Sequence, residues 1–153
     1  VLGSPADATT NRLTWHVQES GYLKLITQDD GSVLAFPLMA GNVTGEVTDS
    51  LQDKKASLKI KILEPVTGIT IQGSDTVRAG SGANYSAVIQ PSNASNSKVS
   101  WSVNVDAAVA SITSSGYLKV KKSAPAGTVI TVTCTAQGTN ETVSDSCKVT
   151  VRK

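Results

Sequence analysis

The chain has 153 residues and a formal net charge of +2, divided as about −1 over residues 1–63 and +3 over residues 64–153. This balance is too weak for a nucleic-acid-binding surface, and no apolar run approaches the roughly 20 residues that cross a membrane. Aromatic residues are only 4%, Val, Thr and Ser are abundant, and no window has a helical period, so the composition predicts an all-β protein.

One pattern occurs twice, as PADATTNRLTWHV at residues 5–17 and as PSNASNSKVSWSV at residues 91–103. Each copy ends in an alternation of apolar and polar residues around a tryptophan, which is typical of a strand with one buried face. The offset of 86 residues is too long for a solenoid repeat and suits a complete β-sandwich. The repeat predicts two domains, residues 1–63 and 64–153.

The first domain begins part-way through the repeat. Val1 aligns with Ala87, so nothing in the first domain matches residues 66–86. We expect this domain to lack its first strand and half of its second, which would leave an unpaired edge and an uncovered inner face. The expected source of the missing strands is an upstream part of the natural polypeptide or another chain.

Along the first domain, Trp15 alternates with Leu13 and Val17 and is expected to pack in the core, whereas His16 points outward. Tyr22 and Phe36 are the aromatic residues that we consider for contacts at the surface. The segment Asp29–Ser32 resembles part of a calcium loop but lacks its acidic spacing, and it predicts a tight hairpin turn.

Two features lie toward the end of the first domain. At a constant offset, Gly45 and Glu46 occupy the positions of Thr131 and Val132, which predicts a bulge or a shifted register. Residues 56–62 then alternate as a final strand whose lysines mark solvent faces and a protected edge. A short linker with a proline and no Gly/Ser-rich spacer follows, so we expect a rod of two domains.

The second domain shows a full set of strands. Inward positions are expected for Ile69 and Ile71, for Val77, for Tyr85, Ala87 and Ile89, for Trp101 and Val103, and for alternate residues of the last hairpin, 130–136 and 147–151. Trp101 and Tyr85 are expected to be core aromatics. Cys134 and Cys147 both lie on the inward phase of that hairpin. If they are directly opposite, they are within disulfide range; the alternative is two buried thiols.

No nucleophile motif, glycine-rich phosphate loop or paired carboxylates occur in the sequence, so we expect no enzymatic activity. With one histidine and no Cys-x-x-Cys spacing, we expect no metal site and no cofactor.

The chain resembles tandem bacterial immunoglobulin-like domains of group 2, the family of intimin- and invasin-type adhesin repeats. The residues that carry the resemblance are VTGITIQGSDTVRAG (66–80), YSAVIQPSNASNSKVSWSV (85–103), SSGYL (114–118), AGTVITVTCTA (126–136) and CKVTV (147–151). In the first domain it covers PADATTNRLTW, the turn from Asp29, and Ala40–Gly41.

The resemblance implies two immunoglobulin-like β-sandwiches in an extracellular, cell-surface or virion protein. We expect a non-catalytic spacer stalk or adhesion module, with further domains of the same polypeptide as neighbours and a host-surface protein or glycan as a partner. The alternatives are an accessory domain of a phage tail or capsid, and a carbohydrate-binding module of a secreted hydrolase. Fold alone does not choose among them.

Overall fold

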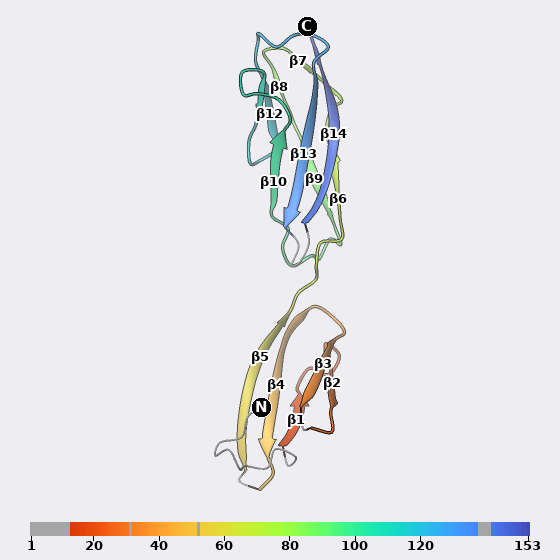
Figure 1. The fold of residues 1–153 in the computed structure, drawn as a ribbon, viewed down its shortest axis with the longest axis vertical. Helices are drawn as coiled ribbons and strands as arrows, with labels where there is room; N and C mark the ends of the chain where they lie inside the picture. Colours follow the sequence, from red (N-terminus) through yellow and green to blue (C-terminus); the bar gives the residue numbers. More distant parts are fainter. Residues whose placement is uncertain (1–12, 31, 52, 138–141) are drawn as a thin grey trace. The chain divides into compact units, whose positions relative to one another are not determined.

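The computed structural model describes residues 13–30, 32–51, 53–137 and 142–153 (Figure 1). Every helix or strand in these ranges is a β-strand, so the all-β prediction is confirmed. The chain divides into two compact units, Val1–Leu63 (unit 1) and Glu64–Lys153 (unit 2). Residues 5–12, which open the first copy of the repeat, and Gly31 of the predicted turn lie outside the described residues.

Unit 1 contains five described strands in two antiparallel sheets. Strands β1 (Leu13–Val17), β4 (Gly41–Asp49) and β5 (Lys54–Ile62) form one sheet in the order β1-β4-β5. Strands β2 (Leu23–Thr27) and β3 (Val33–Pro37) form a hairpin. Among the described residues of unit 1, the buried core cluster consists of Val17, Leu23 and Val43.

Unit 2 contains nine described strands in three sheets. The largest has the order β10-β13-β14-β7, the second β11-β12-β8, and the third is the pair β6-β9. The strands are β6 (Gly68–Gln72), β7 (Thr76–Arg78), β8 (Gly82–Asn84), β9 (Ser86–Gln90), β10 (Val99–Val103), β11 (Ala110–Ile112), β12 (Tyr117–Val120), β13 (Val129–Gln137) and β14 (Thr142–Arg152). This is the antiparallel arrangement of an immunoglobulin-like sandwich, with β7 added in parallel to β14.

The core of unit 2 follows from period-two alternation. In β13, Ile130, Val132, Cys134 and Ala136 are fully buried, while the threonines between them are half-buried. Trp101 and Val103 pack against the same cluster from β10, and Tyr85 and Val77 are buried in it. The two faces of β10 and of residues 130–136 therefore separate apolar from polar side chains, as the alternation predicts.

Strand pairing shows how the two units correspond. Trp15 lies opposite Val47 and Val17 lies opposite Gly45, whereas Trp101 lies opposite Cys134 and Val103 opposite Val132. The offset is 86 residues for the tryptophans and 87 for their partners, so the predicted shift of register near Gly45 is present. The strands described within residues 13–62 correspond to β10–β14 of unit 2, and none of these strands corresponds to β6–β9.

Candidate functional site

An apolar hollow lies in unit 1, where its two sheets face each other. The hollow has a volume of about 280 Å³ and is lined mainly by Trp15, Val17, Leu25, Val33, Leu58 and Ile60. These residues come from β1, β2, β3 and β5 and occupy the inward positions of their strands. The hollow therefore lies between the inner faces of the two sheets of unit 1.

Trp15 differs from the expected plug of a closed core. Its side chain is half-buried, it lines the hollow, and its Nε1–H is buried without an acceptor among the described residues. A buried donor without an acceptor is destabilising, so this N–H marks a place where an acceptor is missing. Trp101, its counterpart, instead packs against the filled core of unit 2.

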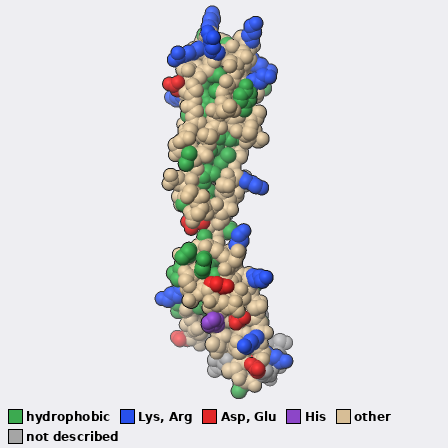
Figure 2. Space-filling view, turned by 180° about the vertical axis from the view of Figure 1, so that it is seen from behind, with side chains coloured by type: hydrophobic (Ala, Val, Ile, Leu, Met, Phe, Trp, Pro, Cys, Tyr) green, Lys and Arg blue, Asp and Glu red, His purple; other side chains and the backbone are tan. Residues whose placement is uncertain are grey.

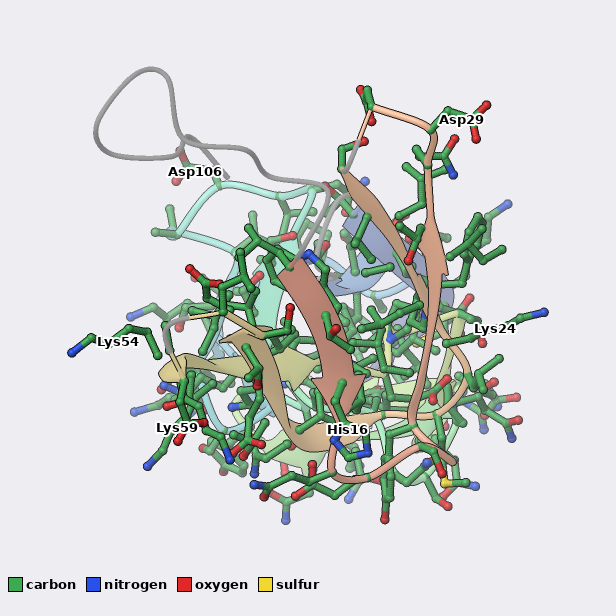
Figure 3. The ribbon with its side chains drawn as sticks, turned by 90° about the horizontal axis from the view of Figure 1, so that it is seen from below. His16, Lys24, Asp29, Lys54, Lys59 and Asp106 are labelled. Atoms are coloured by element: carbon green, nitrogen blue, oxygen red, sulfur yellow. The ribbon has the colours of Figure 1, made fainter. Side chains whose placement is uncertain are left out.

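A second, more open concavity of about 440 Å³ adjoins Trp15 and is lined partly by His16, Ser20, Lys24 and Leu38. His16 is exposed at the end of β1, and Lys24 points away from β2 into solvent (Figure 3). Among the described residues that line the concavity, no nucleophile and base are in hydrogen-bonding contact.

Strand β5 is the last strand of its sheet and exposes apolar side chains. Leu58 is 63% exposed, although it lies opposite Gly45 on the inward phase. Lys59 points outward from the same strand (Figure 3), and Lys55 and Lys61 share its phase, whereas Lys54 lies on the phase of Leu58. Beyond Lys54, the strand thus has an uncovered apolar face and a solvated basic face.

The aromatic residues proposed for surface contacts lie in different settings. Phe36 is 45% exposed on the outer face of the β2–β3 hairpin, beside exposed Leu34 and Ile26. Tyr22 packs against the small core and covers Gly41, so little of its ring is available to a partner. Figure 2 shows hydrophobic side chains at the surface of unit 1.

The turn predicted between β2 and β3 is stabilised by Asp30. Its carboxylate accepts hydrogen bonds from the Ser32 amide at 2.9 Å and from the Ser32 hydroxyl at 2.6 Å, and these bonds lower the pKa of Asp30. Asp29 lies at the exposed tip of the hairpin (Figure 3). The carboxylate of Asp30 therefore serves the turn itself.

The two cysteines do not form the proposed disulfide, because both are free thiols. Cys134 lies opposite Asp145, and Cys147 lies opposite Val132, so the cysteines are diagonal neighbours on one face. Burial raises the pKa of both thiols, and the nearby Asp145 carboxylate raises it further. Both shifts favour the thiol over the thiolate, which is the nucleophilic form of cysteine.

A basic cluster lies at the end of unit 2 where β7 and β14 finish (Figure 2). It contains exposed Arg78, Lys121, Lys122, Arg152 and Lys153. Arg78 Nε donates to the carbonyl of Lys153 at 3.2 Å, and the Ala79 amide donates to the carbonyl of Arg152 at 2.8 Å. These bonds bring the cationic residues of the two strand ends together.

Among the described residues, no group of three or more His, Cys, Asp or Glu side chains is placed to hold a metal ion. The same residues include no helix that is long and apolar enough to cross a membrane.

No family model and no curated protein matches the chain. Solved structures resemble it weakly. Domains 4 and 5 of the S-layer protein SbsC are 16% identical, with 97% of this chain and 74% of that chain covered and a TM-score of 0.40. Chicken VE-cadherin EC1-2 is 17% identical over 95% and 86% of the two chains, with a TM-score of 0.42. Human protocadherin-24 EC1-2 is 14% identical over 93% and 82%, with a TM-score of 0.46. The fold assignment rests on strand pairing and not on these likenesses.

Proposed function

We propose that the chain is a non-catalytic structural module that acts as a rigid spacer in a bacterial cell-surface or secreted protein. It belongs, in this proposal, to the group 2 immunoglobulin-like repeats that its sequence resembles. Its neighbours are further domains of the same polypeptide. The support comes from two β-sandwich units in direct succession, from the connection between them, and from the lack of a catalytic arrangement in the described residues.

The connection carries the proposal. Strand β5 ends at Ile62, and unit 2 begins at Glu64 with a fixed backbone. The Glu64 amide donates to Ser95 Oγ at 2.9 Å, and the Ser95 amide donates back to the Glu64 carbonyl at 2.9 Å. These two hydrogen bonds hold the connection on its unit 2 side, and Pro65 restricts the backbone torsions that follow.

Insertion of a flexible segment tests the spacer. We expect ¹⁵N relaxation of the full chain to give both units one shared rotational correlation time. Inserting Gly-Gly-Ser-Gly-Gly-Ser between Leu63 and Glu64 should let them tumble separately, with a shorter correlation time for each. The insertion leaves the hydrogen bonds of both units in place. If the two units already have separate correlation times in the chain without the insertion, the rigid spacer is refuted.

A binding assay distinguishes a spacer from an adhesive module. Phe36 is the exposed aromatic of unit 1, so Phe36→Ser is the informative variant, and Tyr22→Phe is its control because it keeps the packed ring. A spacer should show no saturable binding on a glycan array. Saturable binding by the full chain that is lost in Phe36→Ser would instead assign a carbohydrate-binding role.

A further inference from the structure

Unit 2 shows how this fold covers the inner face that unit 1 leaves open. Ile71, Val77 and Tyr85 pack in its core, and all three come from residues 66–86. Val77 pairs in parallel with Val151 of β14, and the Ile71 amide donates to Asp145 Oδ2 at 2.8 Å. Tyr85 is 3% exposed, and its hydroxyl donates to the Ser74 carbonyl at 2.6 Å.

Unit 1 has the receiving surface of this arrangement. Through the strand pairs, Trp15 corresponds to Trp101 and Gly45 to Val132, and Leu58, Ile60 and Ile62 of β5 correspond to Cys147, Val149 and Val151 of β14. Val132, Val149 and Val151 are buried in unit 2, with Trp101 and Cys147 packed against their cluster. In unit 1 the same positions border the hollow or the free edge of β5. We call Trp15, Val17, Leu58, Ile60 and Ile62 the acceptor face.

We propose that the acceptor face binds a β-strand-forming peptide segment from outside these 153 residues. The segment has the chemistry of Val66–Ser86: alternating β-branched residues that lie along β5, and an aromatic residue that enters the hollow. Its backbone pairs with the open edge of β5, which is the strand-addition mode of peptide recognition.

The described surfaces and the sequence disfavour the other occupants. Residues 1–12 contain only two large apolar residues, Val1 and Leu2, and so lack the alternation that the face requires. A second copy would have to withdraw Val77 and Tyr85 from its own buried core. Two β5 edges would bring exposed Lys55, Lys59 and Lys61 of each copy together, which like-charge repulsion opposes.

Titration of the full ¹⁵N-labelled chain with a synthetic peptide of the sequence Val66–Ser86 tests the proposal. We expect saturable shifts of β1, β2 and β5 amides and of the Trp15 indole resonance. Alternate amides of β5 should exchange more slowly with solvent when the peptide is bound. A peptide carrying Ile71→Ser and Tyr85→Ser should bind at least about tenfold more weakly, because its two apolar anchors are lost.

Neighbouring residues on opposite faces of β5 supply matched protein variants. Leu58→Ser removes an apolar contact of the acceptor face and should weaken binding about tenfold. Lys59→Ser lies on the outward face and should keep the affinity within about twofold. Both side chains are exposed in the free chain, so neither change disturbs its core.

Four outcomes would overturn the proposal. These are the absence of saturable binding, shifts confined to unit 2, protection of β5 amides in a concentration-dependent dimer, and binding that appears only after deletion of residues 1–12. The third assigns the face to a second copy and the fourth to the chain's own first residues. The acceptor face does not depend on the spacer proposal, since peptide binding and shared tumbling are separate measurements.

Discussion

Asp145 ties the first strand of unit 2 to its last strand. Its Oδ2 accepts from the Ile71 amide of β6, and its Oδ1 accepts from the Ser146 amide at 2.8 Å. Asp145→Ala leaves the part-buried Ile71 N–H unpaired, so we expect unit 2 to lose about 1–3 kcal/mol of unfolding free energy. Urea denaturation measures the loss, and faster exchange of the Ile71 amide locates it.

Lys148→Ala is the control for Asp145→Ala, because Lys148 is exposed on the same strand. Its effect should stay within about 0.5 kcal/mol. Similar losses in both variants would show that the hydrogen bond between Asp145 and Ile71 adds no measurable stability.

Tyr85 makes unit 2 sensitive to alkaline pH. Burial, followed by the nearby Cys147 and Asp75, raises the pKa of Tyr85 to about 12 from its ordinary 10.0. A folded-state pKa above the unfolded value stabilises the fold below pH 10, and this contribution is lost as the pH rises through about 12. We expect the unfolding free energy of unit 2 to fall over that window.

Tyr85→Phe tests whether this alkaline sensitivity comes from the tyrosine itself. The variant loses the hydrogen bond to Ser74, which costs about 1 kcal/mol at neutral pH, but its stability should fall less between pH 10 and 12. Urea midpoints measured at several alkaline pH values test this. An unchanged slope in Tyr85→Phe would contradict the assignment to Tyr85.

The cysteines show what residue patterns leave undetermined. Alternation correctly places Cys134 and Cys147 on one face, because the side-chain period of a strand is two. A two-residue change of pairing keeps every side chain on the same face, so the pattern is the same whether Cys147 lies opposite Cys134 or opposite Val132. The structure has the second arrangement, and the sequence carries no signal that distinguishes the two.

Among the elements, the turn between β11 and β12 depends on Gly116. Its φ is 84°, and a Cβ there would overlap the carbonyl oxygen of Tyr85 and press on the Trp101 ring. Gly127 has a similar φ of 85°, but a Cβ there meets nothing within 4 Å. Comparing Gly116 with Gly127 therefore separates the effect of the backbone conformation on stability from the effect of steric crowding.

We expect Gly127→Ala to destabilise unit 2 by about 1–2 kcal/mol, the cost of a left-handed alanine. Gly116→Ala should cost about 1–3 kcal/mol more, because the added methyl also displaces packed neighbours. Denaturation of the two variants in parallel gives the difference. Equal losses would mean that the turn moves freely away from Tyr85 and Trp101.

Strand β4 offers the reverse case at Gly45. A Cβ at Gly45 would lie 3.6 Å from Ile60 Cδ1, which is an ordinary van der Waals contact. Gly45 also lines the hollow, so the added methyl group has room. Alanine is favoured over glycine within a strand, so Gly45→Ala should stabilise unit 1 by about 0.5–1 kcal/mol. Amide exchange of β4 and β5 residues in unit 1 measures the gain, and faster exchange would contradict it.

The repeat predicts that the two units share a set of strands, but it does not predict how completely each core is filled. Five described strands follow the start of each tryptophan motif, β1–β5 and β10–β14, and of the bulge or shifted register expected near Gly45 the structure has the shifted register. Trp15 and Trp101 have the same local pattern, yet only Trp101 lies in a filled core. The difference depends on Ile71, Val77 and Tyr85, which are distant in sequence from Trp101.

At the scale of the whole molecule, the two units contrast in how much apolar surface they bury. Where the structure describes the chain, ten buried residues form the core cluster of unit 2, whereas three form that of unit 1. Unit 1 also leaves large side chains such as Leu58 and Leu38 in solvent. Because apolar burial is the dominant favourable term in folding, the described contacts assign most of the stability to unit 2.

We therefore expect the chain to unfold in two steps, with unit 1 unfolding at the lower urea concentration. Residue-resolved NMR across a urea series should show loss of the Trp15 indole signal before that of Trp101. Saturation with the Val66–Ser86 peptide should move the first step toward the second, because a ligand that binds only the folded unit stabilises it by mass action. A single transition in the free chain, with both tryptophan signals lost together, would mean that unit 1 draws its stability from contacts beyond its own small core.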